Sequence, residues 1–151
     1  WTDEWGNELS TDDEYTYQGY AEGDKVVRVE INNGCETTEQ EFNFTVLGEP
    51  SSEFMAYPNS GTFEMRAAYA FDATYPVTYA WTIQSYDDAA QLLATQNYST
   101  RSESYTIPAN TVSITVTLTV TYEGTECFST TQKTICIPSS THDCCETCVG
   151  G

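Results

Sequence analysis

A strict alternation of side chains from Ser113 to Tyr122 constrains the fold more than any other feature of the sequence. Every second residue of this run is apolar and the residues between are serine or threonine; the apolar members are Ile114, Val116, Leu118, Val120 and Tyr122. A period of two is typical of a β-strand with one buried and one solvated face. The pattern recurs over residues 62–71 at Phe63, Met65, Ala67, Tyr69 and Phe71, and in shorter runs at Val27, Val29, Ile31 and at Phe42, Phe44, Val46. The sequence therefore predicts an all-β chain.

Short turn sequences separate these runs, as antiparallel sheets require. They contain glycine, asparagine or proline, which supply the backbone angles of tight reversals, at Asn32-Asn33-Gly34, Asn59-Ser60-Gly61, Pro108-Ala109-Asn110 and Glu123-Gly124. The stretch Asp87 to Ala94 fits a helical turn capped by an aspartate or, equally, a short strand.

The chain also contains an internal repeat. In the same order along the chain, Trp1-Thr2 matches Trp81-Thr82, Tyr15-Thr16-Tyr17 matches Tyr105-Thr106-Ile107, Val27-Arg28-Val29 matches Leu118-Thr119-Val120, and Asn33-Gly34-Cys35 matches Gly124-Thr125-Glu126-Cys127. This match predicts three segments: the second half of a unit in residues 1–49, a complete unit in 50–138, and a Cys-rich tail in 139–151.

The repeated features resemble the polycystic-kidney-disease (PKD) type of immunoglobulin-like repeat found in bacterial surface proteins and phage structural proteins. The likeness rests on Tyr79-Ala80-Trp81, on Tyr105-Thr106-Ile107, on the threonine-rich strand of residues 112–121 and on the Asn-Gly-Cys turn. It implies tandem immunoglobulin-like β-sandwiches, the first incomplete at its N-terminus, with Trp81 as a buried central tryptophan, and a spacer, adhesive or decorating role.

Half a sandwich leaves an apolar face and an unpaired strand edge exposed, so something must cover them. Two sources fit: an earlier segment of the same polypeptide, or strands donated by a neighbouring subunit, as in β-strand addition. The sequence leaves both open.

Charge excludes several kinds of partner. The 5 Lys plus Arg stand against 23 Asp plus Glu, for a net charge of −18, so nucleic acid is not expected as a partner because phosphate binding needs a basic surface. No apolar run reaches the roughly 20 residues that cross a bilayer, which argues against membrane insertion. Six cysteines indicate an oxidising location: extracellular, cell surface or virion surface.

The disulfide candidates are Cys35, Cys127, Cys136, Cys144, Cys145 and Cys148. If Cys127 and Cys136 share one extended strand, they lie about 30 Å apart and cannot pair with each other. The spacing of Cys145 and Cys148, with His142 or Cys144 nearby, also fits a zinc site, although a tail held by disulfides is the favoured interpretation.

Acidic pairs suggest loop-bound calcium, with Asp12, Asp13, Asp87 and Asp88 as candidate ligands, but a solvated acidic surface is the simpler reading. No cofactor is expected otherwise. Asn97, expected in a loop, and Asn43, expected in an edge strand, match the N-glycosylation pattern.

No pattern of catalytic residues is present, and the predicted function is non-enzymatic. We expect a structural subunit of an extracellular or virion surface assembly (a filament, appendage or decoration) joined through β-strand edges and disulfides. The expected partners are copies of itself or neighbouring structural subunits. The alternatives are a spacer module of a larger surface protein and a glycan-binding adhesin, in which exposed aromatic residues would stack on carbohydrate: Trp5, Tyr17 and Tyr20.

Overall fold

The computed structural model describes residues 1–19, 21–68 and 75–138. Within this part of the chain every regular element is a β-strand, and all strand pairs are antiparallel. The all-β prediction is therefore confirmed. The chain divides into two compact units, which we call the N-terminal unit (Trp1–Gly48) and the C-terminal unit (Glu49–Gly151).

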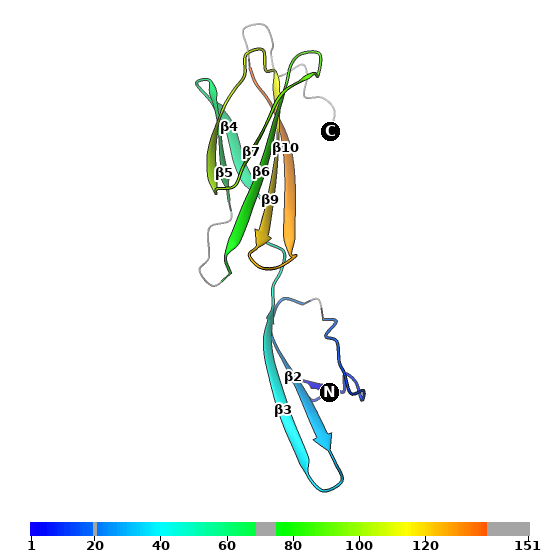
Figure 1. Cartoon of the computed structure of the whole chain (residues 1–151). Coiled ribbons are helices and arrows are strands. Elements are labelled where there is room, and N and C mark those ends of the chain that lie inside the picture. Colours follow the sequence, from blue (N-terminus) through cyan, green and yellow to red (C-terminus); the bar gives the residue numbers. More distant parts are fainter. Residues whose placement is uncertain (20, 69–74, 139–151) are drawn as a thin grey trace. The chain divides into compact units, whose positions relative to one another are not determined.

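The C-terminal unit contains two antiparallel sheets (Figure 1). One has the strand order β10-β9-β6-β7 and the other the order β4-β5-β8. The strands are β4 (Phe54–Asn59), β5 (Thr62–Ala67), β6 (Val77–Tyr86), β7 (Leu92–Tyr98), β8 (Ser102–Thr106), β9 (Ser113–Tyr122) and β10 (Phe128–Cys136). The alternating run that predicted a strand is β9, with the same bounds.

The core of the C-terminal unit lies between the inner faces of its two sheets. The apolar residues of β9 are all buried, as their spacing predicted, and so are three of the five predicted on the second run: Phe63, Met65 and Ala67. Tyr69 and Phe71 lie outside the described residues. Trp81 is 1% exposed and contacts Phe54 of the other sheet edge to face, with ring centroids 5.3 Å apart. A tryptophan thus joins the two layers, which gives the unit a β-sandwich-like architecture.

Polar contacts also link the two sheets. The Ser85 hydroxyl on β6 lies 2.9 Å from the Tyr105 hydroxyl on β8. At one edge, the Ser52 hydroxyl lies 2.8 Å from that of Thr131, and Lys133 donates a 2.8 Å hydrogen bond to the Phe54 carbonyl. Buried hydroxyls are therefore paired, as a stable interior requires.

The N-terminal unit contains a single sheet of three strands in the order β1-β2-β3. The strands are β1 (Thr2–Asp3), β2 (Gly23–Asn32) and β3 (Thr37–Val46). The hairpin β2–β3 pairs along its whole length, whereas β1 pairs only with Val27 and Arg28 of β2. The described part of this unit has no second sheet.

The four predicted turns are confirmed, because each contains a residue with positive φ: Gly34, Gly61, Asn110 and Gly124. The stretch Asp87 to Ala94 is a turn followed by the start of β7, so the helical alternative is wrong and the strand alternative holds only from Leu92 onward. Asn97 lies within β7, paired with Thr82, and not in the loop where it was expected. The loop prediction failed because residues 95–98 are polar and show no strong apolar alternation. This segment is a strand because it pairs with β6.

Leu118 tests the packing of the sandwich. It is fully buried, so we expect Leu118→Ala to lower the free energy of unfolding by about 3 kcal/mol through lost burial and a residual cavity. Leu92, which is 53% exposed, provides the matched control, and Leu92→Ala should cost less than about 1 kcal/mol. Urea unfolding followed by circular dichroism measures both. Equal losses for the two variants would contradict this packing.

Candidate functional site

The sheet of the N-terminal unit has one apolar face. The hairpin register sets Val27 opposite Phe42, and because side chains alternate along a strand their neighbours two residues away share this face. We call this surface the apolar face; it comprises Val27, Val29, Ile31, Phe42 and Phe44. It is the largest hydrophobic surface that the hairpin offers.

An irregular segment, residues 10–19, partly covers the apolar face. Trp1 and Tyr15 stack against each other with centroids 6.0 Å apart, and Trp1 lies equally close to Phe42. Tyr17 meets Phe44 edge to face at 5.0 Å. The Trp1 indole nitrogen also donates a 2.9 Å hydrogen bond to the carbonyl of Asp12, which fixes the segment over the sheet. These aromatic residues surround a small cavity of about 240 Å³.

The cover is incomplete. Val27 is only 4% exposed, but Ile31 is 60% exposed, Phe42 45% and Phe44 36%. The corresponding inward residues of β9 are between 0% and 9% exposed. The apolar face is therefore buried at Val27, most open at Ile31 near the tip of the hairpin, and partly exposed along β3 at Phe42 and Phe44.

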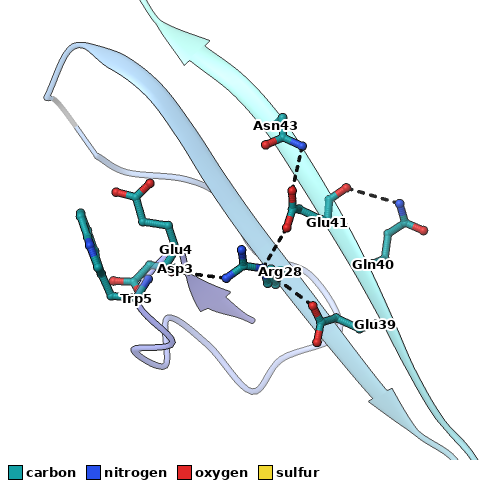
Figure 2. A network of polar contacts seen from close by, with 8 residues as sticks. All are labelled: Asp3, Glu4, Trp5, Arg28, Glu39, Gln40, Glu41 and Asn43. Carbon is teal, nitrogen blue, oxygen red and sulfur yellow. Dashed lines mark hydrogen bonds and ion pairs between the residues drawn. The ribbon is translucent and has the colours of Figure 1, made fainter.

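The opposite face of the same sheet is polar (Figure 2). Arg28 on β2 lies between two carboxylates of β3, at 2.9 Å from Glu41 and 3.7 Å from Glu39, and donates to the Glu4 carbonyl at 3.3 Å. The side-chain hydrogen bond from Asn43 and then the contact with Arg28 lower the pKa of Glu41. These charges keep one face of the sheet in water.

Strand β3 forms an open edge. It pairs only with β2, and all of its residues except Val46 are exposed. At the hairpin turn, the Asn33 amide donates a 3.2 Å hydrogen bond to the Glu36 carbonyl, so these two residues form a hydrogen-bonded pair. Along an antiparallel ladder such pairs alternate with pairs whose backbone groups point away from each other. This alternation directs the backbone groups of Glu39, Glu41 and Asn43 away from β2. They form a row of main-chain donors and acceptors that another strand can use.

A groove of about 990 Å³ lies beside the open part of the apolar face. Its lining includes the apolar residues Trp1, Val29, Ile31 and Phe42 and four acidic residues, Glu8, Asp12, Asp13 and Glu30. We call it the carboxylate groove. Its lining contains no lysine, arginine or histidine.

One loop occurs in both units with the same geometry. The Asp3 carboxylate accepts hydrogen bonds from the amides of Trp5 and Asn7, and the Asp87 carboxylate accepts from the amides of Ala89 and Gln91. In each loop the fourth residue has positive φ: 83° at Gly6 and 57° at Ala90. This conformation is easy for glycine and less favourable for alanine.

The shared loop corrects the alignment of the two repeats. Asp3 corresponds to Asp87, so Trp1 occupies the position of Ser85 and not that of Trp81, with which the sequence match paired it. The strand pairing agrees with this alignment. Thr2 directly precedes Asp3 and pairs with Arg28, and Tyr86 directly precedes Asp87 and pairs with Ser113. The match between Trp1 and Trp81 in the sequence was therefore a coincidence between two large residues at inward positions of equivalent strands.

The four calcium candidates belong to two different units. Asp12 and Asp13 lie on the rim of the carboxylate groove, while Asp87 and Asp88 belong to the β6–β7 turn of the other unit, where Asp87 is occupied by backbone amides. Among the described residues, no three His, Cys, Asp or Glu side chains are grouped closely enough to hold a metal ion.

The cysteines fall into three groups. Cys35 is an exposed free thiol at the tip of the β2–β3 hairpin. Cys127 directly precedes β10 and Cys136 ends it, so they lie along one extended run, as the argument against their pairing assumed; Cys136 is disulfide-bonded. The tail residues His142, Cys144, Cys145 and Cys148 lie outside the described residues, and with them the zinc candidate.

The glycosylation candidates lie in different units, whereas two of the sugar-stacking candidates line one groove. Asn43 and Asn97 are exposed and lie on edge strands β3 and β7 of different units. Trp5 is 78% exposed, and Tyr17 packs against Phe44. Trp5 and Tyr17 both line a groove of about 450 Å³, together with Tyr15. Tyr20 lies outside the described residues.

Comparison of the chain with protein-family models, curated proteins and solved structures finds no match. In the described residues, no helix has the length and apolar character needed to span a membrane.

The segment that covers the apolar face has little signature in the sequence. Its only signal is the alternation of Tyr15 and Tyr17 within an otherwise acidic and polar stretch, and these two rings are the ones that contact Trp1 and Phe44. The carboxylate groove was not visible in the sequence, because its lining combines residues of the first thirteen with residues of β2 and β3.

The Asp3 loop makes a prediction about pH. The side-chain hydrogen bond from Asn7 is the largest influence on the Asp3 carboxyl and lowers its pKa below 3.8. The ionised form therefore stabilises the loop above the ordinary pKa, and this stabilisation is lost as the pH falls through the lowered value. Asn7→Ala should raise the pKa of Asp3, measured by NMR titration of the carboxyl carbon. An unchanged value would contradict the loop geometry; Asn43→Ala, which leaves this loop intact, is the control.

Proposed function

We propose that this chain is a structural subunit of an extracellular or virion-surface assembly, built from immunoglobulin-like sandwiches of the PKD type and joined to its neighbours through β-strand edges and disulfides. The observation that carries the proposal is the N-terminal unit. It has one sheet, a partly open apolar face and an open edge strand, and such surfaces in a stable protein call for a partner.

The architecture of the C-terminal unit supports the choice of sandwich. Two facing sheets in the orders β10-β9-β6-β7 and β4-β5-β8 fit a seven-stranded immunoglobulin-like arrangement, in which a central strand carries a buried tryptophan. Trp81 lies on β6, an inner strand of its sheet, and is buried. Repeated sandwiches of this kind commonly serve as building blocks, although the fold alone does not determine a function.

The charge on β3 favours contact between different surfaces of neighbouring subunits. If β3 paired with β3 of a second copy, the carboxylates of Glu39 and Glu41 would face like charges across the new ladder, which is destabilising. Pairing of β3 with a different edge avoids this repulsion. A contact between unlike surfaces repeats from one subunit to the next and produces rings or filaments.

Thiol chemistry supports covalent joining in an oxidising compartment. Cys35 is exposed at the end of a hairpin, so its sulfur is accessible to a second chain. Cys136 is already in a disulfide, which fits an oxidising location.

Blocking the β3 edge tests the assembly. The Asn43 amide points away from β2, so Asn43→Pro removes an outward donor without removing a β2–β3 ladder bond. We expect the wild-type chain to associate with increasing concentration and the variant to associate about tenfold more weakly, since one lost main-chain bond is worth about 1 kcal/mol or more. Sedimentation velocity measures both.

The matched control for the edge is Asn43→Thr, which removes the same side chain but keeps the amide and should associate like the wild type. Two results would contradict assembly through β3: a wild-type chain that stays monomeric at every concentration, or an Asn43→Pro variant that associates as strongly as the wild type.

The role of Cys35 is tested separately. Under non-reducing conditions the assembled chain should give cross-linked species on a gel that disappear with reductant, and Cys35→Ser should reduce them strongly, because thiol access sets the rate of disulfide formation. The control combines Cys35→Ser with Ser51→Cys, at an exposed position of the other unit. This double variant regains an accessible thiol and should not restore the same cross-link pattern. Unchanged cross-linking in Cys35→Ser would exclude this cysteine.

A further inference from the structure

We propose that the chain pairs with a second copy of itself through the outer face of the sheet β10-β9-β6-β7. We call this surface the threonine face; it consists of the outward side chains of these four strands, with Thr117 near its centre. The contact rests on the proposed assembly function, and it is distinct from the β3 edge and from Cys35. It packs one sheet against another and leaves every strand edge unused.

The threonine face carries no charge. Side chains alternate along a strand, so the residues between the buried members of β9 point outward: Thr115, Thr117, Thr119 and Thr121. Their partners on the neighbouring strands are also neutral, and Thr117 pairs with Gln132 of β10 and Thr82 of β6. Within these four strands, all of which the structure describes, no outward position holds Asp, Glu, Lys or Arg.

The other sheets of the described chain have charged outer faces. On β5, Glu64 and Arg66 alternate with the buried residues. The polar face of the N-terminal sheet carries Arg28 with its two glutamates. Since 19% of the whole chain is charged, a four-stranded neutral surface stands out. Two copies that each have a net charge of −18 repel one another least where this surface is the point of contact.

The charged residues lie around the face, in the turns that end its strands. Asp87 and Asp88 belong to the turn between β6 and β7, and Glu123 and Glu126 to the turn between β9 and β10. A neutral centre with a charged rim is the usual anatomy of an interface between proteins, in which the fully buried part is depleted of charged residues.

The polar groups of the face are already paired within the sheet. Three hydrogen bonds between 2.8 and 3.0 Å join β9 to β10: Thr115 with Thr134, Thr119 with Thr130, and Thr117 with Gln132. A fourth joins β6 to β7, where the Thr82 hydroxyl donates to the side-chain oxygen of Asn97 at 3.0 Å. A polar group that keeps its hydrogen bond can be covered without the cost of an unsatisfied one. The threonine methyl groups then favour removal from water.

The size of the face fits a specific pair. Its four strands are 7 to 10 residues long. At the usual strand spacing and rise the face measures about 19 Å by about 30 Å, or roughly 600 Å². Two such faces bury about 1,200 Å² together, which is the lower end of the range for stable, specific interfaces.

The neutrality of the face identifies the partner as a second copy. A charged surface would give up its hydration here without meeting an opposite charge. A copy of the same face brings neutral side chains and the same twist, so the two sheets pack about 10 Å apart with their strands aligned to within about 30°. The same patch then serves on both chains, which gives a two-fold pair that closes on itself. Added to contacts through β3, such pairs join filaments side by side.

The test places a charge at the centre of the face. It uses the full chain with Asn43→Pro, which weakens contacts through β3, as the parent. Thr117→Glu and Thr117→Lys should each weaken pairing at least tenfold, because a two-fold contact brings like charges together. An equimolar mixture of the two variants should pair again, because opposite charges then meet. Sedimentation equilibrium measures pairing, and circular dichroism checks that both variants fold.

Matched controls separate the face from general effects of charge. Thr106 is an exposed threonine on β8 of the other sheet, so Thr106→Glu and Thr106→Lys should pair like the parent. Added salt should strengthen pairing of the parent, since it screens the repulsion between two acidic chains.

Four results overturn the proposal: a parent that stays monomeric up to its solubility limit, Thr117 variants that pair like the parent, a mixture of the two variants that does not recover pairing, and stronger pairing of Thr117→Lys alone, since net charge then governs association. A monomeric parent that is retarded by dextran in affinity electrophoresis, with the retardation lost in Thr117→Glu, identifies a neutral glycan as the occupant and also overturns self-pairing.

These results are separable from the test of the assembly function. If the wild type associates through β3 and the Thr117 variants change nothing, pairing through the face is excluded and the assembly function stands. If the parent forms pairs while the wild type forms nothing larger, assembly through β3 is excluded and pairing through the face stands.

Discussion

The structure depends on one constraint: a β-sheet with an apolar face needs a second layer over it. The C-terminal unit meets this need with two sheets, and Trp81 of one packs against Phe54 of the other. The N-terminal unit meets it only in part, with an irregular segment whose tyrosines pack against Trp1 and Phe44. Its exposed Ile31, its open strand edges and its groove all follow from that shortfall.

The acidity of the chain acts on the same surfaces. An open edge strand is an aggregation hazard, and natural proteins protect such edges with charge. Glu39 and Glu41 on β3, and Glu30 on β2, place carboxylates along both open edges of the hairpin. Negative charge therefore opposes indiscriminate pairing between identical chains while leaving the backbone groups accessible.

Local patterns in the sequence predicted much of the fold. The alternation over residues 113–122 and the turn residues at Gly34 and Gly124 were sufficient because they act within a few residues. Features that depend on distant contacts were not predictable. The placement of Asn97 in β7 results from pairing to β6, and the equivalence of Asp3 with Asp87 rests on hydrogen bonds that no residue pattern displays. The groove joins residues from separate stretches, so no motif could reveal it.

The two hairpins differ in the charge on their outward faces. On the outward side of β9, the threonines at 115 and 117 face Gln84 and Thr82 of β6, and neutral residues pair with neutral residues. On the outward side of β2, Glu30 is paired with Glu39 of β3, so like charges face each other across the ladder, which is destabilising. Arg28 lies between Glu39 and Glu41 and supplies opposite charge on this face. The N-terminal hairpin therefore keeps its outward face charged and in water, and its need for a second layer is confined to the apolar face.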